Sequence, residues 1–281
     1  MDCELVTEGT LYVVATPLGN LGDITDRARE VLRGVPMVAA EDTRRTRILL
    51  DRLDAHPRIV ALHAHSRATD VARVIDALEG GEDVALVTDA GTPSVSDPGA
   101  ALARAAREAG VATVAVPGPS AVTAALSISG LPADRFLFLG FLPRKGSSRA
   151  KLLKQAVSSE WTVVLFESPE RLVRLLEDLA RRSDAGRTAA VARELTKVHE
   201  ECRTGTLSEL AAYYRKNKAR GEVTVILEGS PPHGVAVDRD RLLERARELL
   251  ASGGTKRDVA GRLADEFAIP RREAYQLVNE L

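Results

Sequence analysis

The sequence predicts an α/β protein with two α/β lobes, an N-terminal one built mainly on a parallel sheet and a C-terminal one on a mixed sheet, followed by a helical tail. Three observations lead to this fold class. Between residues 11 and 117, short β-branched runs alternate with helix-like stretches. Beyond residue 119 this alternation gives way to strands that follow one another closely. From residue 238 to 281 the pattern is helical throughout.

The expected strands of the first lobe are near-continuous apolar runs, the pattern of parallel strands covered by helices on both faces. The repeated strand–helix units indicate an open α/β sheet, in which the helices connect parallel strands by right-handed crossovers. Pro98 and Gly110 mark the start and the end of the last expected helix. The expected strands are 11–15, 35–40, 58–63, 83–88 and 111–116, and the helices between them are 26–32, 43–53, 69–78 and 98–109.

In the second lobe, residues 195–199 join two expected strands as a hairpin, so this sheet contains antiparallel pairs. The expected strands are 135–141, 161–167, 188–194, 200–207 and 222–228. The expected helices are 119–129, 147–157, 169–181 and one between the last two strands. The proline-rich stretch 231–234 is a linker, which gives domains at 1–118, 119–232 and 233–281.

The tail is expected to form three helices, at 238–251, 255–267 and 270–281, with joints short enough for a helix-turn-helix. Two interpretations are open: an appendix packed on the body of the protein, or a nucleic-acid contact. Its cations, such as Lys256 and Arg257, are offset by acids such as Asp258.

Composition excludes several classes of function. The chain has 281 residues with 39 Lys and Arg against 40 Asp and Glu, so diffuse polycation binding is excluded while a local basic patch is not. The two cysteines, Cys3 and Cys202, allow no disulfide framework, and no Cys/His cluster predicts a metal site. No third metal-binding side chain lies at a suitable spacing from His63 and His65. With no membrane-length apolar run and no signal-like N-terminus, we expect a cytoplasmic protein.

Ligands of open parallel sheets bind at the carboxyl ends of the strands. The loop after the first strand, 16–23, contains glycine but is neither a dinucleotide fingerprint nor a P-loop, which weakens nicotinamide and nucleoside-triphosphate functions. The loop after the fourth strand, 88–99, holds two prolines, two glycines and two aspartates, a rigid surface that a ligand can approach closely. The stretch 117–121 then starts a helix whose free amides face the same crevice.

Charged residues cluster in three places. Glu41 and Asp42 open a helix, and capping explains one of these acids but not both. The arginines that follow, from Arg44 to Arg47, either bind phosphate or pair with these acids. The basic runs 144–154 and 215–220 are either solvated faces or the contact surface of a polyanion.

The stretch 11–25, LYVVATPLGNLGDIT, resembles the N-terminal motif of the bacterial RsmI family, the 16S rRNA cytidine 2′-O-ribose methyltransferases of the tetrapyrrole-methylase (class III) superfamily. Similar stretches follow in the same order, at 40–44, 89–93 with 96–99, 117–121, 136–145 and 191–197 with 199–201. The resemblance covers about residues 11–229. It departs at Glu170, which follows Glu-Ser-Pro where the family commonly has histidine.

The resemblance implies a homodimer and a cleft between two lobes that binds S-adenosylmethionine. The implied substrate is a cytidine of 16S rRNA in the small ribosomal subunit. The implied cofactor contacts are Pro17, Leu18, Gly19, Asn20, Asp89, Ala90, Gly91, Thr92, Ser120, Ala121, Phe166 and Glu167. The residues expected to contact RNA are Arg44, Arg45, Arg144, Lys145 and Arg193.

Methylation of a ribose hydroxyl also needs a proton acceptor. The first candidate is Lys197, provided that burial beside Arg193 lowers its pKa, although Lys197 could equally pair with Glu194 or Glu200. The other candidates are the carboxylates of Glu41, Asp42, Asp97 and Glu167. Two alternatives to the rRNA function stay open: a methylase of a tetrapyrrole or diphthine-type substrate, and a non-catalytic, ligand-sensing module that binds nucleic acid.

Overall fold

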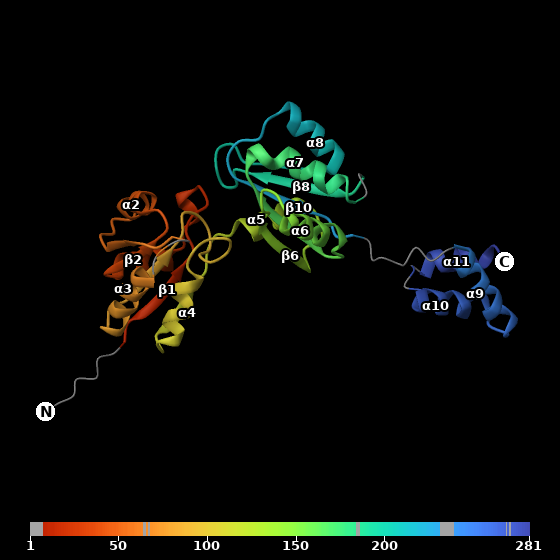
Figure 1. The fold of residues 1–281 in the computed structure, drawn as a ribbon, viewed down its shortest axis with the longest axis horizontal. Helices are drawn as coiled ribbons and strands as arrows, with labels where there is room; N and C mark the ends of the chain where they lie inside the picture. The colour runs from red at the N-terminus through yellow and green to blue at the C-terminus, as the bar shows by residue number, and fades with distance from the viewer. Residues whose placement is uncertain are drawn as a thin grey trace.

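The structure is a computed structural model that describes residues 8–63, 66, 68–183, 186–230, 239–267, 269 and 271–281. Two α/β lobes follow one another along the chain, and a unit of three helices ends it (Figure 1). Cys3, His65 and the expected linker 231–234 lie outside the described residues.

The first lobe contains a fully parallel sheet with the strand order β3-β2-β4-β1-β5. Helices α1 and α2 bury Leu32 and Leu50 against one face, whereas α3 and α4 bury Leu78 and Leu102 against the other. The strands are β1 (Thr10–Val14), β2 (Met37–Ala40), β3 (Arg58–Ala61), β4 (Val84–Val87) and β5 (Ala112–Val116); the helices are α1 (Asp26–Gly34), α2 (Thr43–Arg52), α3 (Ala68–Glu79) and α4 (Ala100–Glu108). The expected two-sided parallel sheet is therefore confirmed.

Two helix ends in this lobe lie two residues from their predicted positions: α1 ends at Gly34 and not at residue 32, and the start of α4 also differs. Helix α4 begins at Ala100 and not at Pro98, because Gly99 takes a φ of 131° and ends the preceding loop. The two residues that the helix loses belong to the loop after β4, which is correspondingly longer.

The second lobe contains a mixed sheet with the strand order β6-β7-β10-β8-β9, in which only the β6–β7 pair is parallel. The expected hairpin is confirmed, since β8 and β9 pair antiparallel from Thr188↔Thr206 to Arg193↔Glu201. The strands are β6 (Phe136–Phe141), β7 (Thr162–Glu167), β8 (Thr188–Arg193), β9 (Glu201–Thr206) and β10 (Val223–Leu227); the helices are α5 (Ala121–Ser129), α6 (Ser147–Ser158), α7 (Pro169–Ala180) and α8 (Leu207–Lys216).

The two faces of this second sheet have different partners. Helices α6, α7 and α8 cover one face around Leu153, Leu176 and Tyr214. Helix α5 covers the other face, and its Val122 and Leu126 share a hydrophobic cluster with Leu18 from the first lobe. This shared cluster fixes the loops of the first sheet against the second lobe.

The tail consists of α9 (Arg239–Ala251), α10 (Lys256–Phe267) and α11 (Arg271–Asn279), drawn in blue in Figure 1. Its buried residues, such as Leu242, Leu263 and Val278, form a cluster of their own that contains no residue of either lobe. One interpretation of the tail sequence was packing on the body of the protein. The core residues do not support that interpretation. No helix in the described ranges has the length and apolar character needed to cross a membrane.

Candidate functional site

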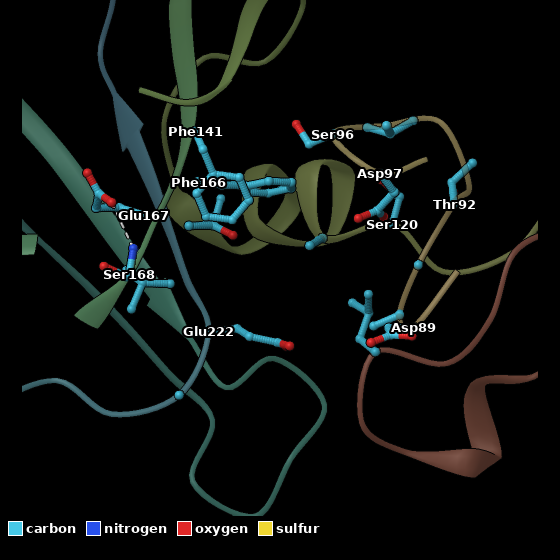
Figure 2. Close-up of a pocket in the computed structure, with 18 of the residues that line it drawn as sticks. Asp89, Thr92, Ser96, Asp97, Ser120, Phe141, Phe166, Glu167, Ser168 and Glu222 are labelled. Atoms are coloured by element: carbon cyan, nitrogen blue, oxygen red, sulfur yellow. Dashed lines mark hydrogen bonds between the residues drawn. The ribbon is translucent and has the colours of Figure 1, made fainter. Parts of the chain in front are cut away.

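A cleft of about 400 Å³ lies where the loops of the first sheet meet the second lobe (Figure 2). The loops after β2, β4 and β5 face the end of β7 and the start of β10 across it. Its lining residues are Leu18, Glu41, Arg45, Asp89, Ala90, Gly91, Thr92, Val95, Ser96, Asp97, Ser120, Ala121, Phe141, Phe166, Glu167, Ser168, Pro169, Gly221, Glu222, Val223 and Thr224. Nine of the twelve cofactor contacts implied by the resemblance are among them; Pro17, Gly19 and Asn20 are not.

Backbone hydrogen bonds tie the loops of the first lobe together. Thr16 and Gly91 exchange two of them, with N···O distances of 2.9 and 3.0 Å. Gly91 has a φ of 86°, and a Cβ there would approach the Leu18 side chain to 3.2 Å, so the glycine keeps this wall of the cleft thin. The Thr92 hydroxyl donates to the carbonyl of Pro119 at 3.1 Å. The loops after β1, β4 and β5 therefore form one connected wall.

Carboxylates dominate the charge of the cleft. Among the residues that the structure describes, five acids line it, Glu41, Asp89, Asp97, Glu167 and Glu222, against a single cation, Arg45. Glu41 accepts a hydrogen bond from the Thr88 hydroxyl at 2.9 Å. Asp89 accepts from the backbone N–H of Asp42 at 3.1 Å and pairs with Arg45 at 3.3 Å. The cleft is thus suited to a cationic ligand.

Asp97 has the most perturbed carboxyl of the cleft. Its pKa is raised to about 6, mainly by burial. A hydrogen bond with the Thr88 hydroxyl offsets part of the shift, and the negative charges of Glu41, Asp89 and Glu222 add to it. Figure 2 shows its side chain directed into the space between the loops and the second lobe. A carboxylate with a pKa near 6 is a stronger base than an ordinary aspartate and still largely ionised at pH 7.

Asp42, one of the predicted catalytic residues, has a structural role as a helix cap. Its side chain caps α2, accepting from the backbone N–H of Arg44 at 2.8 Å and of Arg45 at 3.4 Å, and it does not line the cleft. Hydrogen bonds from Arg44 lower its pKa, so it is a poor proton acceptor. Capping thus accounts for Asp42 and leaves Glu41 free to face the cleft.

The expectation that burial lowers the pKa of Lys197 is wrong. Its Nζ donates to Glu194 at 2.9 Å and to Glu222 at 3.1 Å. Burial alone would lower the pKa of Lys197, but the two carboxylates outweigh it and raise the pKa above the ordinary value. The ion-pair interpretation holds for Glu194, and the second partner is Glu222 where Glu200 was expected. The Lys197 stem also lies against Gly19, where a Cβ would come within 2.3 Å of Cγ.

Glu167 lines the cleft but is held in place. Its carboxylate pairs with Arg171 at 2.8 Å and accepts from the backbone N–H of Ser168 at 2.9 Å, with the side chain fully buried. Phe166 beside it packs edge-on against Phe138, with ring centroids 5.0 Å apart. These two residues form a rigid wall of the second lobe.

Nine lining residues were not predicted as site residues, among them Ser96, Phe141 and Glu222. Ser96 and Phe141 lie inside stretches already noted, at 88–99 and 136–145. Glu222 precedes β10, whereas the ligand loops expected from an open parallel sheet follow its strands. Because β10 runs antiparallel to β7, with Val223 opposite Glu167, its start lies at the same edge as the end of β7.

The predicted RNA-contacting residues are dispersed. Arg44 is exposed beside Asp42, and Arg144 and Lys145 are exposed before α6. Arg193 lies away from the cleft and pairs with Glu201 at 2.7 Å. Within the basic run 144–154, Arg149 is no surface cation, because it is buried and pairs with Asp178 at 2.9 Å.

No group of three or more His, Cys, Asp or Glu side chains with metal-binding geometry occurs in the residues that the structure describes. The backbone N–H of His63 instead donates to the Ser66 hydroxyl oxygen at 2.8 Å, and the same hydroxyl lies 2.9 Å from Nδ1 of the His63 ring.

The fold and the cleft define a class of protein. The family described as Tetrapyrrole (Corrin/Porphyrin) Methylases matches residues 10–211, most of both lobes. Among solved structures, uroporphyrin-III-C-methyltransferase from Thermus thermophilus has a TM-score of 0.55 at 24% identity, covering 78% of this chain and 94% of that one. Diphthine synthase has a TM-score of 0.60 at 20% identity, covering 78% and 89%. The chain is thus a methyltransferase with the tetrapyrrole-methylase fold.

Closer relatives narrow the class. Ribosomal RNA small subunit methyltransferase I of Synechocystis sp. is 42% identical, with 97% of this chain and 98% of the relative covered. Proteins of the same name from Xylella fastidiosa and Escherichia coli O157:H7 are 47% and 39% identical, with 96% and 98% of this chain covered and 98% and 96% of theirs. The chain belongs to this family of small-subunit rRNA methyltransferases, as the sequence motifs indicated.

S-adenosylmethionine is the methyl donor of this class, and the cleft fits it. The carboxylates suit a sulfonium cation, and Leu18, Ala90, Ala121 and Phe166 offer apolar surface for a base. Gly91 allows a ligand to approach the backbone closely.

Proposed function

We propose that this chain methylates the 2′-hydroxyl of a cytidine ribose in the 16S rRNA of the small ribosomal subunit. The observation that carries the proposal is the extent of similarity. The rRNA methyltransferase relatives match 97% of the chain, a share that must take in the helical tail, whereas the solved tetrapyrrole and diphthine methylases cover 78%. The small-molecule and diphthine alternatives do not account for the tail, and a non-catalytic module does not account for the carboxylates of the cleft.

Within this function, we propose Asp97 as the group that accepts the proton of the ribose hydroxyl. Asp97 lines the cleft, and its pKa of about 6 makes it both basic and ionised near neutrality. S-adenosylmethionine supplies the electrophilic methyl group. Asp97 would accept the proton of the O2′–H bond while O2′ bonds to the methyl carbon that bound S-adenosylmethionine would supply. The S–CH3 bond would break, and S-adenosylhomocysteine would be the leaving group.

The remaining predicted residues take supporting roles in this proposal. The loop 88–92 and the start of α5 would hold the methyl donor, together with Leu18, Phe166 and Glu167. Arg45 would stay paired with Asp89 and shape the donor side of the cleft. The exposed Arg44, Arg144 and Lys145 would contact RNA phosphates outside it.

The test is incubation with labelled S-adenosylmethionine and two RNA substrates: undermodified small ribosomal subunits and naked 16S rRNA. We expect label in 16S rRNA, at a cytidine whose ribose resists cleavage by alkali at the modified linkage. Label on a base, or in a protein or small molecule alone, would contradict the proposal. The implied homodimer is tested on the same sample by sedimentation equilibrium, where a monomer at the assay concentration rules it out.

A further inference from the structure

A second pocket, of about 410 Å³, opens beside the hairpin of the second lobe. The end of β8, the hairpin turn, the end of α8 and the segment after α8 line it, and we call it the basic pocket. Its residues are Arg193, Glu194, His199, Glu201, Tyr213, Tyr214, Asn217, Lys218 and Arg220. None of them belongs to the cleft.

The charges of the basic pocket do not cancel. Both of its acids already have cationic partners: Glu201 is held by Arg193 at 2.7 Å and by Arg203 at 3.1 Å, and Glu194 by Lys197. Lys218 and Arg220 are exposed, and the described residues contain no ion-pair partner for either. The pocket therefore offers two free cations to a ligand, which favours an anion.

A buried hydroxyl points to the same conclusion. Tyr214 is only 2% exposed, and its hydroxyl oxygen has no hydrogen-bond partner among the described residues. Leaving a buried polar group unpaired is costly, so native structures normally pair it with protein, water or a ligand. Burial raises the pKa of Tyr214 to about 12, so the hydroxyl keeps its proton and can donate it.

The basic pocket is continuous with the cleft along the chain. Lys218 and Arg220 line the pocket, and the next two residues, Gly221 and Glu222, line the cleft. Lys197 joins the two sites from the other side, because it bonds to Glu194 of the pocket and Glu222 of the cleft. A polymer with one unit in the cleft could therefore reach the pocket with a neighbouring unit.

We propose that the basic pocket binds a phosphodiester group of the RNA strand, next to the nucleotide that enters the cleft, through Lys218, Arg220 and the Tyr214 hydroxyl. The inference rests on the proposed rRNA function. The paired acids keep Arg193 oriented at the rim, and the unpaired cations supply the attraction. A charged donor set of this kind binds phosphate more strongly than a neutral one.

The test compares the wild-type chain with Lys218→Ala, Arg220→Ala and their double variant. Lys216→Ala is the matched control, since Lys216 is an exposed cation of the same segment that does not line the pocket. Binding of naked 16S rRNA and of undermodified small subunits is measured by filter retention over a range of salt, without turnover. We expect the double variant to bind RNA about tenfold more weakly and the control to bind nearly as well as wild type. The slope of log Kobs against log salt concentration should become less steep by about 0.7 for each lost phosphate contact.

Tyr214→Phe separates ligand binding from folding. If the hydroxyl serves RNA, KM for RNA rises severalfold with kcat unchanged, while the chain is as stable as wild type or more so, because an unpaired buried hydroxyl is gone. An unchanged KM for RNA in both Tyr214→Phe and the double variant overturns the proposal.

Two further results are informative. One distinguishes RNA phosphate from free phosphate as the ligand, and the other separates the proposal for the pocket from the proposed methyltransferase function. If inorganic phosphate binds the wild-type chain but not the double variant, and RNA affinity is equal in both, the pocket is a free-phosphate site and the RNA assignment fails. Because RNA binding is measured without methyl transfer, the result for the pocket is independent of the labelling test. Absence of label in RNA overturns the proposed function even where RNA affinity depends on Lys218 and Arg220.

Discussion

At the scale of single residues, neighbouring charge decides which ionisable group can do chemistry. Asp97 and Lys197 were both candidates, and acids surround both of them. Negative neighbours raise the pKa of either group. For a carboxylate this increases basicity while leaving it ionised near pH 7, whereas for a lysine it stabilises the protonated form that cannot accept a proton. The carboxylates near each group therefore support Asp97 as the proposed proton acceptor and count against Lys197.

Asp97→Asn is expected to reduce kcat by at least about 100-fold with little change in the Kd of S-adenosylmethionine. For wild type, log kcat/KM should fall with a slope of one below about pH 6, where Asp97 becomes protonated. Radiometric assay of rRNA methylation from pH 5 to 8 measures both. The matched control is Asp42→Asn, a nearby carboxylate outside the cleft whose replacement preserves the helix cap. A variant Asp97→Asn with wild-type kcat would refute the assignment.

The same substitution should stabilise the fold. The pKa of Asp97 lies above that of an unfolded aspartate, so its charge destabilises the native state above pH 6, and this penalty vanishes as the pH falls toward 3.8. We expect Asp97→Asn to raise the free energy of unfolding by on the order of 1 kcal/mol at pH 8, allowing for partial solvent screening. The gain should shrink at pH 5. Urea denaturation at both pH values provides the measurement, and equal gains would contradict it.

Lys197→Met tests the other candidate. Since Lys197 is held protonated by Glu194 and Glu222, its loss should leave kcat within about tenfold of wild type and the acidic limb of the pH profile in place. A proton acceptor would instead cost about 100-fold or more. Single-turnover methylation with saturating RNA separates the two outcomes.

At the scale of secondary-structure elements, strand direction limited what could be predicted. Apolar runs and helix punctuation sufficed to place all ten strands and the helices between them, with ends shifted by one or two residues. The loops after β1, β4 and β5 were predicted to face one ligand crevice, and residues of all three line the same cleft. Glu222 was not predicted to line the cleft, because its position depends on the antiparallel pairing of β10 with β7, which local sequence does not encode. Tyr214 escaped because its helical spacing is that of an ordinary core residue.

A buried ion pair joins helices α6 and α7. It could not be predicted, because its arginine lies within the basic run 144–154, which has the sequence pattern of an exposed surface. Arg149 and Asp178 are both largely buried, with a side-chain N···O distance of 2.9 Å. We expect Arg149→Ala to lower the free energy of unfolding by about 3 kcal/mol, near the low end for buried pairs because Arg181 still contacts Asp178. Lys151→Ala, an exposed site on the same helix, should change it by less than about 0.5 kcal/mol. Chemical denaturation of the three proteins decides.

At the scale of the whole molecule, the distribution of hydrophobic cores separates the catalytic body from the tail. Leu18 of the first lobe shares a cluster with α5 and the second sheet, whereas the tail buries its apolar residues among its own helices. The lobes should therefore unfold together and the tail separately. The sequence predicted a linker and a helical tail, but it did not predict the separate cores, because these depend on which apolar faces meet in space.

A chain that ends at Ser230 tests the separation. No cleft residue comes from the tail, so the truncated protein should bind S-adenosylmethionine with unchanged Kd by calorimetry. Its affinity for small ribosomal subunits should fall, at least severalfold, if the tail contributes to substrate binding. Loss of cofactor binding by a truncated protein whose circular dichroism shows folded lobes would contradict the separation of the two units.

The cluster around Leu18 also bears on how members of this family can be recombined. A chimera that takes its first lobe from one relative and its second from another replaces one side of a packed core, not only the walls of a binding site. Leu18 must then fit Val122, Leu126 and Leu195 of the new partner before any substrate preference can be read. Exchange of the tail carries no such packing constraint, because its apolar residues are buried among its own helices.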